Sequence, residues 1–127
     1  MADPKYDLED RFVEFAVGII RLSRELPETK AGKHVCTQLL RSGTSPAPNY
    51  GEAQSAESRA DFIHKLKVAL KELRETQIWL KIIVRSQLLE PPSCANRLRR
   101  EANELISILF ASIRTARENQ NKRNNRE

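Results

Sequence analysis

The chain has 127 residues, the size of one domain, and carries 22 Lys and Arg against 17 Asp and Glu, for a formal net charge of +5. Four glycines are too few for a turn-rich β-sandwich or a glycine-rich phosphate loop. The apolar runs are far shorter than the roughly 20 residues of a membrane span, and the acidic N-terminus lacks the apolar stretch of a secretory signal. These features predict a cytoplasmic protein with no membrane association.

Helical periodicity dominates the first half of the chain, where apolar residues recur at intervals of three and four. The first predicted helix covers residues 7–26, with Asp7 as its N-cap and Pro27 as the residue that ends it, because a proline ring cannot continue a helix. The second predicted helix covers residues 31–56. We expect it to bend or restart near residues 43–46, where a glycine precedes a Ser-Pro pair typical of an N-cap and a first helical position.

The second half of the chain shows the clearest helical pattern. The third predicted helix covers residues 58–86 and begins with a capping box, in which Asp61 stands three residues after Ser58. Because no glycine or proline occurs between Ser58 and Pro91, this helix can reach about 40 Å in length. The fourth predicted helix covers residues 93–118.

Four long helices with short connections are typical of an antiparallel up-down four-helix bundle, and no segment alternates with period two for long enough to form a strand. We therefore predict an all-α fold, with a single domain over residues 1–118. The polar and basic residues 119–127 are predicted to form a disordered tail.

Cationic side chains gather along one edge of the third predicted helix. On a helical wheel five of them fall within an arc of about 80° that contains no acidic residue. They are Lys67, Lys71, Arg74, Lys81 and Arg85. The fourth predicted helix adds Arg99, Arg100, Arg114 and Arg117. Such a ridge indicates phosphate-backbone affinity without sequence specificity, and the alternative is a solvated face that binds nothing.

Apolar side chains also lie outside the predicted core stripes of these two helices. Val68 and Trp79 occupy the other flank of the third helix, and Ile106 and Phe110 are rotated away from the core of the fourth. We interpret these four residues as an oligomer interface, because aromatic anchors are enriched at interfaces. A wide core stripe within one bundle is the alternative.

No constellation of residues predicts catalysis or metal binding. Cys36 and Cys94 form no C-x-x-C pair, and their spacing to His34 and His64 does not match a ligand set. There is also no Walker-type loop and no G-x-G-x-x-G motif. The sequence therefore predicts a non-enzymatic protein without a cofactor or metal.

Two stretches of the sequence carry a family resemblance: QLLRSGTSPAPNYGEA at residues 38–53 and DFIHKLKVALKE at residues 61–72. The chain closely resembles the 23S rRNA intervening-sequence proteins, also called four helix bundle proteins, over about residues 8–115. It departs from the common pattern at Pro48 and Gly51, where a helix-favouring residue is more usual.

The resemblance implies a four-helix bundle that assembles into a ring-like homopentamer. It also implies kinship with the accessory variability determinant of diversity-generating retroelements, a basic pentameric barrel that binds nucleic acid and a reverse transcriptase.

The first of these stretches contains small and polar residues that we interpret as a structural motif, namely Ser42, Gly43, Thr44, Ser45, Asn49 and Glu52. If the second helix continues through its bend, several of them fall near its inward face and allow the helices to approach closely. The Asn49 amide is then expected to be hydrogen-bonded internally, because an unpaired buried amide is costly. A ligand-binding role is the alternative.

These observations together predict an oligomeric scaffold that binds RNA or DNA through its basic helices, with a reverse transcriptase as a possible partner class. The alternative is an interaction module that recognises an acidic protein and never meets nucleic acid.

Overall fold

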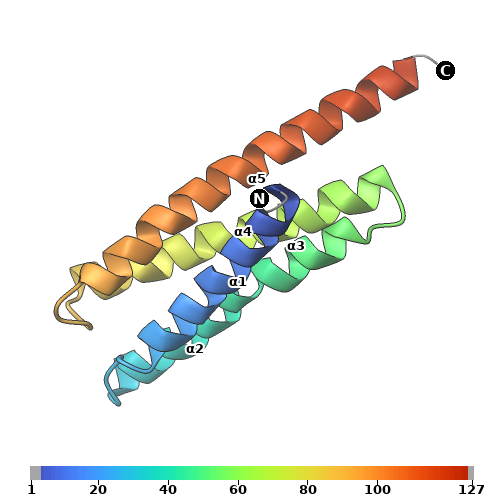
Figure 1. Cartoon of the computed structure of the whole chain (residues 1–127). Helices are drawn as coiled ribbons and strands as arrows, with labels where there is room; N and C mark the ends of the chain where they lie inside the picture. The colour runs from blue at the N-terminus through green and yellow to red at the C-terminus, as the bar shows by residue number, and fades with distance from the viewer. Residues whose placement is uncertain (1–3, 126–127) are drawn as a thin grey trace.

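The computed structural model describes residues 4–125 and is built from helices, with no strand in that range. Figure 1 shows the arrangement. The helices are α1 (Pro4–Ser23), α2 (Lys30–Thr44), α3 (Pro46–Gln54), α4 (Arg59–Arg85) and α5 (Ser93–Asn125). The predicted all-α class is confirmed for the described part of the chain.

The helices enclose one core. α4 packs against α5, α3 and α2, whereas α1 packs against α2, α3 and α5 and its backbone does not come close to that of α4. The residues at the centre are aliphatic and aromatic, and Phe12 of α1 stacks on Tyr50 of α3 with ring centroids 5.0 Å apart. α1 and α4 therefore lie on different sides of the molecule, as Figure 1 shows.

The predicted second helix is interrupted at one residue. α2 ends at Thr44 and α3 begins at Pro46, and Ser45 between them keeps helical dihedral angles of −71° and −36°. Ser45 does not cap α3 with its side chain, contrary to the prediction. Its hydroxyl instead accepts a hydrogen bond from the Asn49 amide, which also donates to the Ser45 carbonyl, each at 3.0 Å. The bend is thus held by a local side-chain contact.

The first predicted helix has different ends in the structure. α1 starts at Pro4, so Asp7 lies inside the helix rather than at its N-cap. Proline is well suited to the first helical position, because the amide hydrogen that it lacks has no partner there. The helix also ends at Ser23, four residues before Pro27. The Glu25 amide donates to the Leu22 carbonyl in a tighter turn.

The last helix is longer than predicted. Residues 119–125 were predicted to be disordered, but α5 continues through them to Asn125. No glycine or proline occurs after Pro92 to stop the helix, and Lys122 and Arg123 in its last turn interact favourably with the helix dipole. Residues 126 and 127, also assigned to the tail, lie outside the described residues.

The start of α4 agrees with the predicted cap. The Ser58 hydroxyl accepts a hydrogen bond from the Asp61 amide at 3.0 Å. The helix then runs to Arg85, and the chain returns through residues 86–92 into α5. No helix in the described part of the chain combines the length and apolarity needed to cross a membrane.

Candidate nucleic-acid interface

A groove between α4 and α5 brings together cations from both helices. It has a volume of about 510 Å³. Leu70, Phe110 and Ile113 form its apolar part. Five cations surround this part: Lys67, Lys71 and Arg74 from α4, and Arg114 and Arg117 from α5. We call this hollow the basic groove. Glu118 and Asn121 complete its lining.

The cationic surface continues towards the other end of α4. Arg74, Lys81 and Arg99 line a second hollow between α4 and α5, together with the exposed Ile78. Lys81 and Arg85 then flank Ile78 and Ile82 along the last turns of α4. Eight of the nine predicted nucleic-acid-binding residues therefore lie along one side of the α4–α5 pair.

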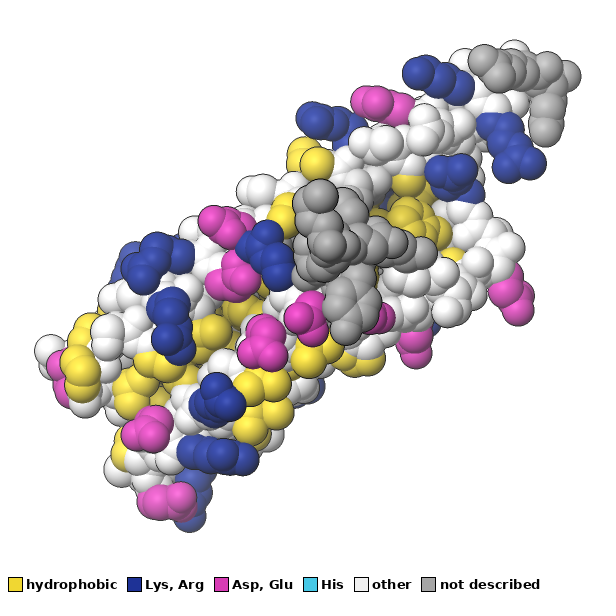
Figure 2. All heavy atoms as spheres, viewed as in Figure 1, with side chains coloured by type: hydrophobic (Ala, Val, Ile, Leu, Met, Phe, Trp, Pro, Cys, Tyr) yellow, Lys and Arg dark blue, Asp and Glu magenta, His cyan; other side chains and the backbone are white. Residues whose placement is uncertain are grey.

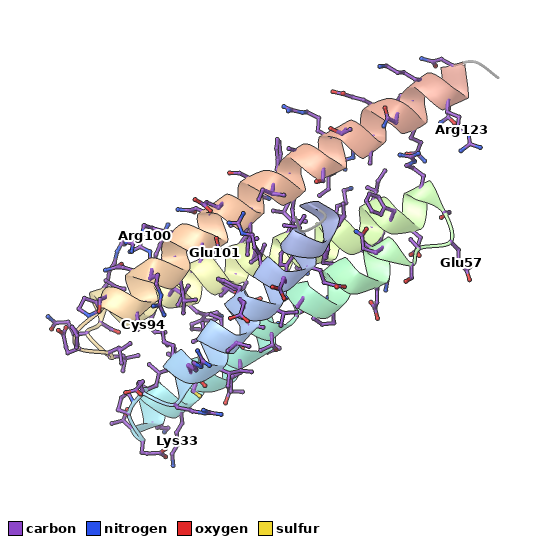
Figure 3. The ribbon with its side chains drawn as sticks, in the orientation of Figure 1. Lys33, Glu57, Cys94, Arg100, Glu101 and Arg123 are labelled. Atoms are coloured by element: carbon purple, nitrogen blue, oxygen red, sulfur yellow. The ribbon has the colours of Figure 1, made fainter. Side chains whose placement is uncertain are left out.

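Arg100 is the member of the predicted set that the structure separates from the rest. It is exposed on α5 beside Glu101, as Figure 3 shows, and lines none of these three hollows. One residue along a helix corresponds to a rotation of about 100°, so Arg99 faces α4 while Arg100 does not.

Four carboxylates of α4 and α5 are paired with cations of other helices, whereas Glu118 lines the basic groove itself. Arg11 of α1 binds Glu101 at 2.5 Å and Glu104 at 2.6 Å. Hydrogen bonding to Glu101, above all, raises the pKa of Arg11 above its usual value. Arg41 of α2 binds both acidic residues at the centre of α4, Glu72 and Glu75. Within residues 8–125, none of the eight cations forms an ion pair.

The positive charge of the α4–α5 side is visible at the C-terminal end of α5. Figure 2 shows Lys and Arg side chains gathered over the last turns of α5. Arg117, Lys122 and Arg123 are all exposed in this part of the helix, and Arg123 projects from its end in Figure 3.

The four residues of the predicted oligomer interface lie on two different surfaces. Val68 and Trp79 are half-buried, and Trp79 donates a hydrogen bond to Glu75 at 3.1 Å and meets the His34 ring edge-on at 5.9 Å. Trp79 is thus largely engaged within the protomer. Ile106 is half-buried in the second hollow, and Phe110 is 54% exposed in the basic groove.

Sequence reasoning missed two exposed apolar residues within the basic ridge. Ile78 is 55% and Ile82 is 38% exposed. The position of Ile78 could have been predicted, because on the helical wheel this residue falls between Arg74 and Lys71.

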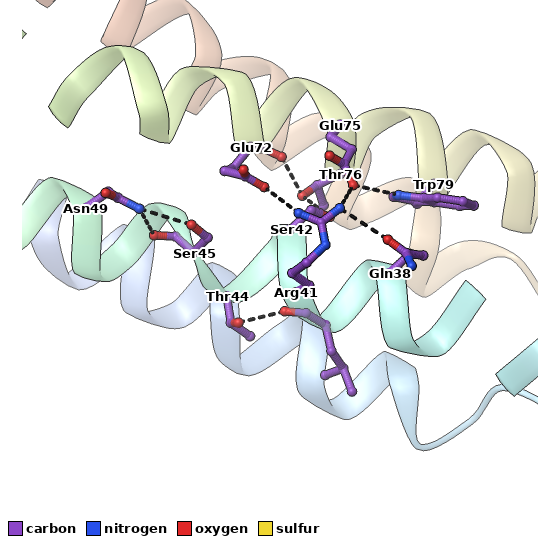
Figure 4. Close-up of polar contacts among 11 residues, drawn as sticks. Gln38, Arg41, Ser42, Thr44, Ser45, Asn49, Glu72, Glu75, Thr76 and Trp79 are labelled. Carbon is purple, nitrogen blue, oxygen red and sulfur yellow. Dashed lines mark hydrogen bonds and ion pairs between the residues drawn. The ribbon is translucent and has the colours of Figure 1, made fainter. Parts of the chain in front are cut away.

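The predicted structural motif contacts α4 and α1, and the close-up in Figure 4 shows the polar contacts of Ser42, Thr44, Ser45 and Asn49. The Ser42 hydroxyl is buried and lies 3.0 Å from the Thr76 hydroxyl of α4, which also hydrogen-bonds to the Glu72 carbonyl. Thr44 donates to the Leu40 carbonyl at 2.6 Å. Gly43 packs directly against Ile19 of α1.

The two remaining polar members of the motif lie further out. Asn49 is half-buried, and its amide donates both hydrogen bonds seen in the described residues to Ser45, which lies between α2 and α3. Glu52 is exposed and forms an ion pair with Lys65 of α4 at 3.1 Å.

Comparisons with known proteins identify relatives of this chain. Residues 5–111 match the family model of the 23S rRNA-intervening sequence protein. Among solved structures the chain is similar to a protein of unknown function from the S23 ribosomal protein family of Bacteroides thetaiotaomicron, with 37% identity and a TM-score of 0.77. The similarity covers 84% of this chain and 97% of the other. No curated protein matched. Because the family model spans most of the chain, this protein belongs to the 23S rRNA-intervening sequence protein family.

Proposed function

We propose that this protein is a non-enzymatic, oligomeric scaffold that acts in the cytoplasm and binds the backbone of RNA or DNA along the α4–α5 side. The observation that carries the proposal is the convergence of eight cations from two helices on one surface, none of them paired with a carboxylate in residues 8–125. A surface of one sign attracts a polyanion. No cofactor is needed for this role, and a reverse transcriptase is a partner class that could receive the bound strand.

Side chains of this kind bind phosphates without reading sequence. Lys and Arg neutralise phosphate oxygens, and each contact releases counterions from the nucleic acid. The affinity therefore depends on salt more than on base sequence.

The test of this proposal is the salt dependence of binding. We expect the logarithm of the affinity for RNA to fall linearly with the logarithm of the salt concentration, with a slope of about −0.7 per neutralised phosphate for a single strand. Fluorescence anisotropy of a labelled oligonucleotide over a salt series measures this slope. A slope near zero would falsify backbone binding.

We also propose that the helices form an antiparallel up-down bundle, and that copies of it assemble into a ring-like homo-oligomer, with the pentamer implied by the family resemblance. A ring requires two different patches on each subunit. Val13 and Ile20 of α1 are 44% and 38% exposed and lie near Glu9, Asp10 and Glu14 in the sequence. Ile78 and Ile82 of α4 are flanked by Lys81 and Arg85, so a contact here takes these two cations from the nucleic-acid surface and leaves the five cations of the basic groove for the strand.

These two patches support a head-to-tail contact. They lie on α1 and α4, on different sides of the protomer. The carboxylates near Val13 are opposite in sign to the cations beside Ile78 and Ile82, although Arg21 and Arg24 follow Ile20. Such complementarity favours pairing of unlike patches from neighbouring copies over pairing of like patches.

A mixing experiment tests the ring. We expect Ile20→Glu and Ile78→Glu each to reduce the particle mass measured by light scattering, because each variant lacks one patch. An equimolar mixture should recover one intact contact and therefore form a dimer and no larger species. Thr37→Glu, an exposed position on α2, is the control and should leave the mass unchanged. If only one of the two variants changes the mass, the head-to-tail arrangement is wrong.

The second candidate function is recognition of an acidic protein segment. The observation that favours it is the presence of exposed isoleucines among the cations, since an acidic amphipathic helix would cover both. Polyglutamate that displaces the oligonucleotide at equal charge concentration would favour this reading.

A further inference from the structure

The basic groove contains an aromatic ring that the protein leaves uncovered. Phe110 is 54% exposed, whereas the other described aromatic side chains are buried or half-buried. Leu70 and Ile113 lie beside it in the groove and are themselves mostly buried. The groove thus combines an accessible ring with an apolar base.

The charges around Phe110 restrict what can cover it. Five cations and one carboxylate, Glu118, line the same groove. An apolar ligand would leave these cations unpaired, and the same face of a second copy would bring five more positive charges against them. The occupant must supply an apolar, planar group together with several negative charges.

A nucleic-acid strand with an unpaired base meets both requirements. A base stacks on an aromatic face, and the adjoining phosphates pair with Lys and Arg. In a duplex the base faces are already stacked on their neighbours and cannot reach a ring in a groove. Only a single strand, a loop or a frayed end offers such a face.

We infer that Phe110 is a stacking platform for one unpaired base, and that the basic groove therefore selects single-stranded over duplex nucleic acid. The flanking phosphates are held by cations on both walls of the groove: Lys67, Lys71 and Arg74 on α4, and Arg114 and Arg117 on α5. The inference rests on the proposed function, which it narrows to one class of ligand.

Substitution of the ring tests the inference. We expect Phe110→Ala to weaken binding of a single-stranded oligouridylate of about 12 nucleotides by roughly 5- to 150-fold, the range that corresponds to one stacked base. Phe110→Leu should bind the oligouridylate nearly as weakly as Phe110→Ala does, because leucine restores apolar volume but has no π-face. Phe110→Trp should retain the affinity. Binding of a duplex of the same length should change by less than about twofold in all three variants.

A second readout separates stacking from simple contact. 2-Aminopurine placed within the oligonucleotide should be quenched by the native protein and by Phe110→Trp, but not by Phe110→Ala or Phe110→Leu. Because Phe110 is exposed, all variants should keep the native melting temperature and particle mass.

Five results would overturn the inference, and they point to different interpretations of the groove. An equal loss for single strands and duplexes, or no loss at all, would leave backbone binding intact and remove the stacking role. A change of particle mass in Phe110→Ala would make the ring a subunit contact. An acidic amphipathic peptide that binds more tightly than the oligonucleotide, with the same dependence on Phe110, would make the groove a peptide site. If no nucleic acid binds at all, the proposed function fails with it.

Discussion

Replacement of Lys67, Lys71 and Arg74 with glutamine is expected to lower the affinity for single-stranded RNA by roughly 100-fold at about 0.1 M salt. The reason is that all three cations line one wall of the basic groove. Each phosphate contact contributes about 0.7 to the magnitude of the salt slope, so the loss of three contacts should also reduce that slope by about 2. Anisotropy titrations over a salt series measure both quantities, and the loss should be the same for every base sequence.

A variant with the same change of charge provides the control. Three exposed cations lie at the end of α1, in the link that follows it and at the start of α2, and none of them lines the described grooves: Arg21, Arg24 and Lys30. Their replacement with glutamine should change the affinity far less, because only the net charge and not the contacts are altered. Equal losses in the two triple variants would mean that overall charge, rather than the groove, determines binding.

Gly43→Val is expected to be the most destabilising single substitution among those considered, with a loss of about 3 kcal/mol. A Cβ atom at residue 43 would lie 2.7 Å from Cγ2 and 2.8 Å from Cγ1 of Ile19. Ile19 is fully buried, so it cannot move aside without disturbing the core. Overpacking of this kind costs about 1–3 kcal/mol, and a β-branched residue adds strain to a helix. Urea denaturation measures the free energy of unfolding.

Gly51 in α3 supplies the matched control for this substitution. Among residues 8–125, a Cβ atom there would meet a Glu9 carboxylate oxygen at 3.9 Å, which is an ordinary contact, and nothing closer. Gly51→Ala should therefore stabilise the protein by up to about 1 kcal/mol, because alanine favours the helix. If Gly43→Val is as stable as the native protein, the close packing of α2 on α1 does not exist in solution.

The sequence predicted the helices best where strong local signals delimit them. α4 begins at Arg59, directly after the predicted cap at Ser58, and it ends within one residue of the predicted end. α1 and α5 were placed less accurately. α1 begins at Pro4, which favours the first helical position, and α5 ends after an uninterrupted polar stretch. Helical periodicity does not detect the end of α5, because residues 119–125 bury no apolar face.

The candidate site was predictable only in part. Helical spacing alone placed Lys67, Lys71 and Arg74 on one edge of α4. It could not show that Arg114 and Arg117 form the opposite wall, since that depends on how α5 packs against α4. Phe110 was assigned to a subunit interface from its place on the wheel, which could not show that five cations and Glu118 surround the ring.

The extra length of α5 bears on how quickly a strand is captured. Asn119 lies beside Arg59 at the start of α4, so the following six residues extend about 9 Å further along the helix axis. Lys122 and Arg123 are therefore carried outward from the body of the protein. Charges on such an arm enlarge the region in which an approaching polyanion is attracted, so the association rate constant should depend on ionic strength even before a strand reaches the groove.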